Sequence, residues 1–267
     1  MKDAEEYINV NRQSWNNRTA AHLESAFYDV NTFLEGKSSL NEIETDLLGD
    51  VNGKIILHLQ CHFGQDTISL ARLGARVTGV DLSDEAILAA KNLAEKAGVS
   101  ANFICCDVYD LPDHLNEHFD IVFTSYGVIG WLPDLDKWAK IISHFLKPGG
   151  ILVFAEFHPV VWMFDNNFKE VAYRYFKDEP IVENESGTYA DREADLELTT
   201  ITWNHSIAEV LSSLFKSNIA VTSFQEYDYS PYNCFRNTIE AEPGKFRISH
   251  MKNYIPMVYS LKAVKGA

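Results

Sequence analysis

The stretch ILHLQCHFGQDTISLARLGARVTGVDLS, residues 56–83, decides the fold. Its first residues belong to a short apolar run, 54–59, of the kind that forms a buried parallel strand. A tight turn containing Gly64 follows, then a segment with helical spacing that ends at Gly74. A second strand, 76–82, carries Asp81 near its end. The turn backbone can approach a ligand and the Asp81 carboxylate can accept from ribose hydroxyls, so the stretch predicts a nucleotide-like ligand.

The alternation of strand and helix continues after this stretch. Ser83 and Asp84 are residue types that cap a helix, which runs to Gly98. Strands are predicted at 101–108, 118–126 and 151–157, with a helix over 135–146 that the LKPGG segment, 146–150, ends. Strands that alternate with helices predict a parallel sheet covered on both faces, with ligands at the carboxyl ends of its strands.

Two regions depart from this rhythm. Residues 1–50 read as a helical cap, divided at Gly36, in front of one domain that spans 51–267. Residues of about 158–203 read as a β-rich insertion, with strands in YRYF, EPIV and LELTTITW and a turn at 184–187. A helix at 206–218 and strands at 219–229 and 254–264 complete the predicted sheet. Pro256 indicates that the last strand lies near an edge or only starts to pair there.

Three later motifs identify a family. They are CCDVYDLP (105–112), FDIVFTSYGVIGWLPDLDKW (119–138) and LKPGGILVFAE (146–156). With the first stretch they resemble the class I S-adenosylmethionine (AdoMet)-dependent methyltransferases. The resemblance is to the small-molecule branch that includes quinone-biosynthesis enzymes, and within it to a subset with the LQCHFG turn. It implies a Rossmann-like, seven-stranded α/β sheet with helices on both faces.

The resemblance also implies roles for individual residues. The turn would hold the methionine part of AdoMet, Asp81 would bind the ribose hydroxyls, and Leu82 would pack on the adenine. The remaining cofactor-binding candidates are Gln60, Cys61, His62 and Gly64 in the turn, Asp107 and Val108 at the adenine edge, and Thr124, Ser125 and Tyr126 beside the reactive methyl group.

One departure from the family pattern concerns the turn itself. The family usually has an acidic residue in the first strand and three glycines in the turn. Here His58, Gln60 and His62 stand at the first three of these four positions, and only Gly64 is kept. Side chains therefore stand where the family lets the backbone approach the cofactor closely. A variant site is expected, and its alternative is a turn that has lost AdoMet binding.

Candidates for acid–base chemistry lie at the strand ends. His158 follows the fifth strand and is a candidate general base, as is Glu156, and Tyr126 is a catalytic candidate at the fourth strand. For each, an ordinary polar or packing role is the alternative. Several aromatic residues are expected either to form a pocket wall or to pack in the core: Trp131, Tyr173, Tyr175, Phe176, Tyr189 and Trp203. An N-terminal set is expected either to form a lid over the cofactor or to cap the core: Trp15, Arg18, His22 and Tyr28.

The amino-acid composition limits the classes of binding partner that are expected. A formal net charge of −15, from 38 acidic and 23 basic residues, disfavours a large nucleic-acid interface and favours a small-molecule acceptor. Neither an apolar run of about 20 residues nor a signal peptide is evident, so a cytoplasmic protein is expected. The four cysteines are expected to be reduced, and the spacing of His and Cys predicts no metal site. A monomer and a homodimer both stay open.

The sequence therefore predicts an enzyme that transfers the methyl group of AdoMet to a small molecule by in-line displacement. Two alternatives remain beside it. A module that binds AdoMet or S-adenosylhomocysteine without chemistry is suggested by the altered turn. An NAD-dependent oxidoreductase is disfavoured because the G-x-G-x-x-G spacing is missing. The acceptor and the methylated atom do not follow from the sequence.

Overall fold

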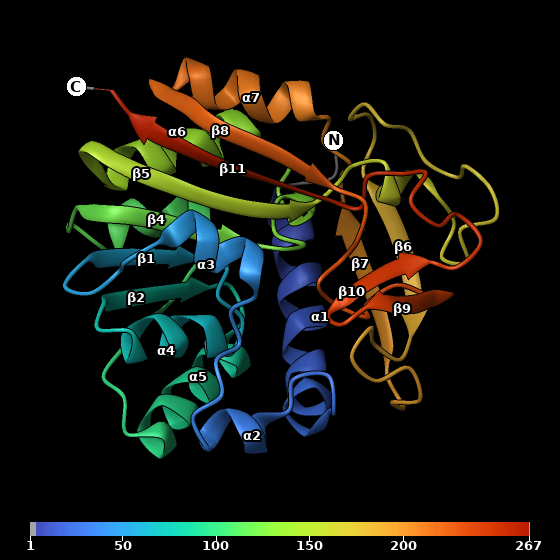
Figure 1. Cartoon of the computed structure of the whole chain (residues 1–267), viewed down its shortest axis with the longest axis horizontal. Helices are drawn as coiled ribbons and strands as arrows, with labels where there is room; N and C mark the ends of the chain where they lie inside the picture. Colours follow the sequence, from blue (N-terminus) through green and yellow to red (C-terminus); the bar gives the residue numbers. More distant parts are fainter. Residues whose placement is uncertain (1–3, 267) are drawn as a thin grey trace.

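The computed structural model describes residues 4–266, and its centre is one seven-stranded sheet (Figure 1). Five strands run parallel: β1 (Ile55–Leu59), β2 (Arg76–Asp81), β3 (Asn102–Cys105), β4 (Phe119–Ser125) and β5 (Leu146–Phe157). β11 (Val258–Lys265) is antiparallel to both β5 and β8 (Ile219–Tyr227). The order is β3-β2-β1-β4-β5-β11-β8, which confirms the predicted Rossmann-like sheet.

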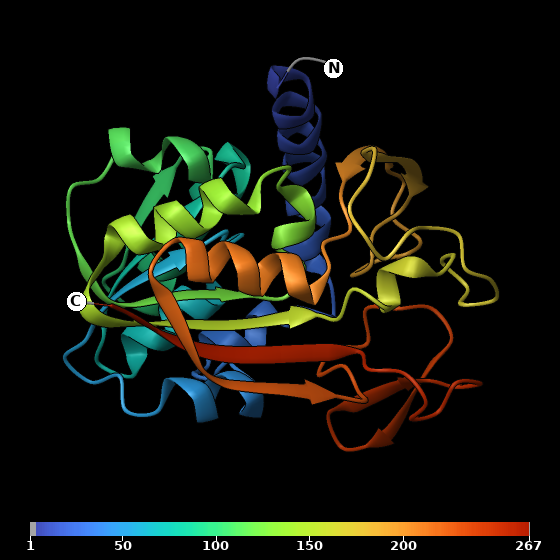
Figure 2. The same cartoon turned by 90° about the horizontal axis from the view of Figure 1, so that it is seen from above.

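Helices cover both faces of this sheet because successive side chains of each strand point to opposite sides. On one face, α3 (Glu42–Leu48), α4 (Gln65–Arg72) and α5 (Asp84–Ala97) bury residues such as Ile56 and Phe103. On the other face, α6 (Leu135–Phe145) and α7 (Ile207–Lys216) lie side by side, as Figure 2 shows, and bury Leu57 and Trp138. The two apolar layers hold the strand ends in fixed register.

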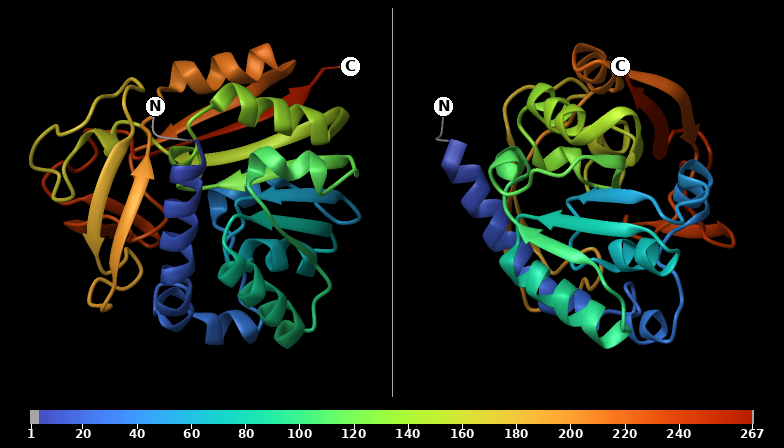
Figure 3. Two further views of the ribbon diagram at one scale, coloured as in Figure 1. Left: turned by 180° about the vertical axis from the view of Figure 1, so that it is seen from behind. Right: turned by 90° about the vertical axis from the view of Figure 1, so that its left-hand side faces the viewer.

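The remaining elements gather at the carboxyl ends of the parallel strands. α1 (Ala4–Glu24) crosses these ends and packs against α5 and β7 (Figures 1 and 3). Beyond it lie two hairpins, β6 (Ile181–Ser186) with β7 (Glu197–Thr202), and β9 (Thr238–Glu242) with β10 (Lys245–Ile248). Asn11 joins α1 to β7, since its amide donates to the Ile201 carbonyl at 2.8 Å and accepts from the Ile201 N–H at 2.9 Å.

The short elements complete the chain: α2 (Val30–Leu34) and the 3₁₀ turns η1 (Val108–Asp113), η2 (Ile129–Trp131) and η3 (Val161–Met163). Helices are therefore present throughout the predicted N-terminal cap, although as three pieces rather than two. No helix between residues 4 and 266 has the length and apolarity needed to cross a bilayer.

Several details of the prediction were wrong. The predicted turn at 184–187 lies largely inside β6, and the actual connection follows Gly187 because its φ of 72° bends the chain there. YRYF is not a strand. For the last strand, one of the two alternatives is confirmed: β11 lies beside the edge strand β8 and begins to pair at Val258, two residues after Pro256, which has no N–H to donate. The β9–β10 hairpin was missed, since four of the five residues of β9 are exposed and β10 has only four residues.

Candidate functional site

The turn between β1 and α4 is left-handed at three positions. The φ angles are 55° at Gln60, 50° at His62 and 79° at Gly64. A side chain in this region of φ costs roughly 1–2 kcal/mol, so Gln60 and His62 hold a conformation that suits glycine better. Gln60 is fixed by a 2.8 Å hydrogen bond from its Nε2 to the Val128 carbonyl. At Gly64 a Cβ would lie 2.6 Å from the Phe103 ring, which explains why this glycine cannot be replaced without a shift.

Asp81 joins this turn to the end of β2. Its Oδ2 accepts from the His62 N–H at 2.7 Å, and its Oδ1 accepts from the Ser83 N–H at 2.9 Å. Burial raises the pKa of the carboxyl to about 6, although the backbone donors act in the opposite direction. Each oxygen retains a second lone pair, so Asp81 can hold the turn and still accept from a ligand hydroxyl.

The end of β3 contributes a second carboxylate to the same side. Asp107 caps η1, since its Oδ1 accepts from the Tyr109 N–H at 2.8 Å. Leu82, Cys106 and Val108 lie beside it in the lining of one large cavity. Apolar side chains flanked by two carboxylates form a slot that suits a planar, hydrogen-bonding ring.

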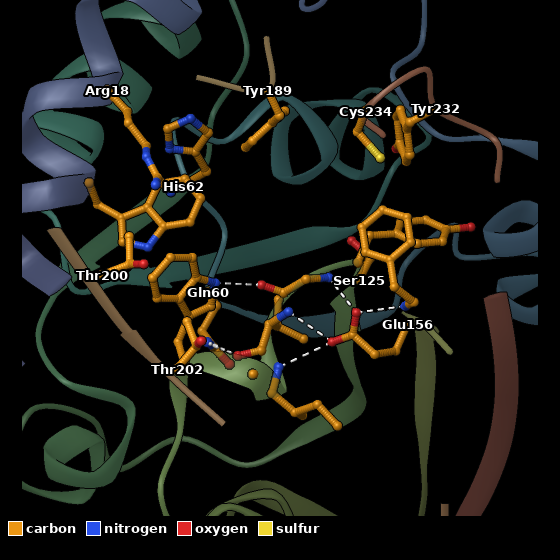
Figure 4. A pocket seen from close by; sticks show the side chains of 18 of the residues that line it. Arg18, Gln60, His62, Ser125, Glu156, Tyr189, Thr200, Thr202, Tyr232 and Cys234 are labelled. Atoms are coloured by element: carbon orange, nitrogen blue, oxygen red, sulfur yellow. Dashed lines mark hydrogen bonds between the residues drawn. The ribbon is translucent and has the colours of Figure 1, made fainter. Parts of the chain in front are cut away.

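That cavity extends from β3 to the insertion and encloses about 940 Å³. Ligand pockets in proteins commonly have 300–1,000 Å³, so the space can hold a nucleoside-sized cofactor and a small second molecule. Figure 4 shows Arg18 and His62 on one side of it and Tyr232 and Cys234 on the other. Nearly all of the predicted cofactor-binding residues line it: Gln60, Cys61, His62, Gly64, Asp81, Leu82, Asp107, Val108 and Ser125.

The end of β4 differs from the prediction at one residue. Thr124 is fully buried and donates to the Leu59 carbonyl at 3.3 Å, so its side chain packs inside the sheet and lies outside the lining. Tyr126 does line the cavity, with a φ of 41° that turns the chain at the strand end. Its hydroxyl donates to Glu44 Oε2 at 3.0 Å. Burial and the nearby Asp66 charge raise the pKa of Glu44 to about 7.

The two base candidates at the end of β5 are both hydrogen-bonded to other parts of the chain, although Glu156 also lines the cavity. The carboxylate of Glu156 accepts the backbone N–H groups of residues 127–129 and of Phe157, which shapes the loop after β4 (Figure 4). His158 was expected to open onto the pocket, and this placement was wrong. Its ring bonds Glu226 of β8 at 2.8 Å and lies outside the cavity lining. Burial lowers the pKa of His158 despite that carboxylate.

α1 contributes a cation to the cavity. Arg18 is 3% exposed, its guanidinium lies 5.1 Å from the Trp15 ring and 5.5 Å from the Trp131 ring, and it pairs with Glu185 of β6 at 3.2 Å. Its buried Nε has no hydrogen-bond partner within residues 4–266. A buried guanidinium with an unused donor is suited to an anionic ligand group.

A histidine pair lies next to this cation. His22 Nδ1 and His62 Nε2 are 2.9 Å apart, so one ring donates and the other accepts. Burial and the Arg18 charge lower the pKa of His22 to about 3, and burial lowers that of His62 as well. Both rings are therefore neutral near pH 7, and the predicted lid residues Trp15, His22 and Tyr28 pack around His62.

The insertion forms only part of the outer wall. Tyr173, Tyr189 and Trp203 line the cavity, as does Trp131. Tyr175 instead accepts from the Ile207 N–H, and Phe176 is 70% exposed, so the prediction that these two form the wall was wrong. The wall is completed by Tyr232, Cys234 and Phe235, which lie in a segment outside every predicted motif.

Two carboxylates at the site were missed from the sequence. Asp66 follows the turn directly and lines the cavity, and Glu44 lies behind Tyr126. Asp66 stands in the quoted stretch, but only the folded turn shows that it faces the cavity. Within residues 4–266, no three His, Cys, Asp or Glu side chains are grouped to hold a metal ion.

Comparisons with known proteins agree with this architecture. Residues 56–150 match the family described as a methyltransferase domain. A ubiquinone biosynthesis O-methyltransferase of Coxiella burnetii is 34% identical over 123 residues, 46% of this chain and 49% of that protein. The enzyme of the same description from Chromobacterium violaceum is 27% identical over 138 residues, 51% of this chain and 59% of that protein. The chain thus spans about half the length of the curated relatives it matches.

Solved structures extend the likeness of fold to nearly the whole chain. A putative S-adenosylmethionine dependent methyltransferase from Listeria monocytogenes gives a TM-score of 0.61 at 20% identity, covering 84% of this chain and 95% of that one. A geranyl diphosphate C-methyltransferase from Streptomyces coelicolor gives 0.62 at 14% identity, covering 99% and 100%.

Proposed function

Because this chain carries a domain of the class I S-adenosylmethionine-dependent methyltransferases, we propose that it is an AdoMet-dependent methyltransferase that acts on a small-molecule acceptor. The observation that carries the proposal is the joint between Asp81 and the left-handed turn. The carboxylate at the β2 end and the turn at the β1 end are bonded to each other at 2.7 Å and face one cavity.

The residues of the cavity fit the parts of this cofactor. Asp81 binds the ribose hydroxyls, while Leu82, Asp107 and Val108 hold the adenine. The turn residues Gln60, Cys61, His62 and Gly64, with Ser125, hold the amino-acid end, and Arg18 binds its carboxylate. The unused Nε of Arg18 and the unused Oε1 of Gln60 support this assignment, because each is a buried polar atom that lacks a partner within residues 4–266.

When bound, AdoMet supplies an electrophilic methyl group on a sulfonium. The chain aligns the acceptor for in-line attack and excludes water around it. A small acceptor is supported by the cavity volume of about 940 Å³ and by the aromatic wall, which includes Tyr126, Tyr189 and Tyr232. Tyr126 is retained as a catalytic candidate at the β4 end. A catalytic role for His158 would require its ring to leave Glu226.

In this proposal, residues 1–50 form the cap and residues 51–267 form the methyltransferase domain, with the insertion at about 158–203. The insertion and α1 set acceptor specificity. A cytoplasmic location, a monomer or homodimer, and the lack of a nucleic-acid partner remain part of the proposal, supported by the acidic composition.

Calorimetry tests the cofactor assignment, with AdoMet, S-adenosylhomocysteine (SAH) and NAD⁺ as ligands. Binding of the first two in the micromolar range is expected. Absence of heat with both, together with clear binding of NAD⁺, contradicts the assignment.

A turnover assay tests the chemistry. SAH release is measured with a panel of phenols, amines, thiols and carbon acids, and at least one acceptor is expected to stimulate it. The second candidate function, an AdoMet-binding module without chemistry, is favoured by the side chains at Gln60 and His62. Tight AdoMet binding without stimulated release by any acceptor would support that second candidate.

A further inference from the structure

Asp66 lines the cavity, and the proposed function assigns no role to its carboxylate. It is the second residue of α4 and lies two positions after Gly64. Its Oδ1 accepts from Ser39 Oγ at 2.6 Å, and its Oδ2 accepts from Ser125 Oγ at 3.4 Å. Asp66 therefore lies between the turn after β1 and the end of β4, next to the residues assigned to the cofactor's amino-acid end.

The partners of Asp66 differ from those of the carboxylates at the strand ends, although Glu183 of the insertion likewise accepts from a hydroxyl, that of Tyr173 at 2.6 Å. Asp81, Asp107 and Glu156 accept backbone N–H groups that belong to turns and caps, and Glu185 pairs with Arg18. Asp66 accepts only from serine hydroxyls, and within residues 4–266 it forms no ion pair with a lysine or arginine. Hydroxyls can rotate away, so its oxygens can change partner without disturbing the backbone.

A buried carboxylate without a cation is unfavourable. Burial raises the pKa of Asp66, and its charge contributes to the raised pKa of Glu44. The Asp66 charge also contributes to the raised pKa values of four neighbouring side chains that are neutral near pH 7: Tyr28, Cys61, Tyr126 and Tyr232. A ligand cation placed at Asp66 would offset this uncompensated negative charge.

A second observation at the turn also indicates a hydrogen-bond donor. The Nε2 of Gln60 is held by the Val128 carbonyl, and its Oε1 is buried without a donor within residues 4–266. Gln60 and Asp66 line the same cavity. An ammonium group carries three N–H donors, so it can satisfy a carboxylate and an amide oxygen together.

Strand β1 itself supplies no negative charge. His58 occupies the position where the resembling family usually has an acidic residue, and its ring bonds Thr67 Oγ1 at 2.8 Å. Burial lowers the pKa of His58 to about 3, so it is neutral. The carboxylate that reaches the cavity beside the turn comes instead from the first turn of α4.

On the basis of the proposed function, we infer that Asp66 binds the α-ammonium group of the cofactor, opposite Arg18, which binds its α-carboxylate. The two charged groups of the amino-acid end are thus bound by residues of two different helices, α4 and α1. The acid that the first strand lacks is replaced from the following helix.

Three probes that differ only in the amino-acid end test this inference. SAH carries both charges, 5′-deoxy-5′-(3-aminopropylthio)adenosine carries the ammonium alone, and 5′-methylthioadenosine carries neither. Affinities are measured calorimetrically, with competition against SAH for weak binders. Asp66→Asn is the variant, and Asp165→Asn, which removes a carboxylate elsewhere in the cavity lining, is the matched control.

Asp66→Asn should weaken SAH and the aminopropyl probe by about ten- to a hundredfold, since hydrogen bonds between charged groups contribute roughly 1.5–3 kcal/mol. It should leave 5′-methylthioadenosine within about twofold, and the control should leave all three within that margin. Equal losses for all three probes, or no loss for any, overturn the inference while wild-type SAH binding keeps the cofactor assignment. Wild-type protein that binds no SAH contradicts the proposed function and this inference with it.

A measurement on wild-type protein covers the case in which the variant does not fold. An ammonium at Asp66 lowers the pKa values of Asp66 and Glu44, so binding of the aminopropyl probe at pH 7 should release protons in excess of 5′-methylthioadenosine. The excess appears as a dependence of the binding heat on the ionisation enthalpy of the buffer. The same proton release for both probes overturns the inference.

Discussion

The sheet side of the cavity and its cover are built in different ways. On the sheet side, contacts are short in sequence or link neighbouring strand ends, as between His62 and Asp81. On the cover, contacts link distant segments: Arg18 reaches Glu185 and Asn11 reaches Ile201. The sheet side is formed largely by residues 56–150, the part of the chain that matches the family. Most of the residues proposed to bind the cofactor lie on the sheet side, and Arg18 is the exception on the cover, so the rest of the cover is free to differ in sequence among proteins with different acceptors.

The largest effect is expected on the sheet side, from Asp81→Ala. Under the proposed assignment this carboxylate accepts two ribose hydroxyls, each bond contributing roughly 1.5–3 kcal/mol, so SAH should bind the variant about a hundredfold more weakly or worse. Calorimetry gives the affinity, and circular dichroism checks that the fold is kept. Unchanged affinity would show that the ribose lies elsewhere.

On the cover, Arg18→Gln should have a smaller and more selective effect. It removes one charged partner of the amino-acid end, so SAH should weaken by roughly tenfold to a hundredfold and 5′-methylthioadenosine hardly at all. Glu185→Gln is the matched control, because it frees Arg18 and should leave SAH binding equal or tighter. A loss of SAH binding in Glu185→Gln as large as that in Arg18→Gln would indicate that the ion pair only supports the fold.

Glu44→Gln tests the contact at Tyr126, where the cover meets the sheet side, through the pH dependence of stability. The pKa of Glu44 is raised to about 7 in the folded protein from an ordinary 4.5, so the folded state holds its proton more tightly than the unfolded state. The stability from that proton is present below pH 4.5 and is lost as pH rises through 7.

Glutamine does not titrate, so the melting temperature of Glu44→Gln relative to wild type should rise by a few degrees between pH 5 and pH 8. Differential scanning calorimetry across this range measures the difference. A difference that stays constant with pH would mean that Glu44 has an ordinary pKa.

The smallest effect is expected from Gln60→Gly. Glycine removes the strain of a side chain in the left-handed region, roughly 1–2 kcal/mol, while loss of the hydrogen bond to Val128 costs about 1 kcal/mol. The free energy of unfolding in urea should therefore change by about 1 kcal/mol or less. SAH binding should weaken by up to about tenfold, because the variant also removes the Gln60 Oε1 that the inference assigns to the ammonium group. A loss of SAH binding comparable to that of Asp81→Ala would show that the Gln60 side chain, not the turn backbone, holds the cofactor.

The sheet and the cofactor side were predictable because their signals are local. The apolar runs form strands, Gly64 lies in the turn before α4, Gly98 ends α5 and Asp81 ends β2, each as the local pattern predicted. Thr124 and His158 could not be placed, since their side chains are turned by the partners Leu59 and Glu226 from other strands. Glu44, Tyr232 and the β9–β10 hairpin reach the site only through tertiary packing, for which the chain carries no short-range pattern.

A crystal structure of the protein with SAH tests the account most directly. The account predicts the ribose hydroxyls on Asp81, the adenine beside Leu82 and Asp107, and the thioether sulfur facing the space enclosed by Tyr126, α1 and the insertion. SAH bound away from Asp81, or with its sulfur open to solvent and the insertion packed only against a second copy, would contradict it.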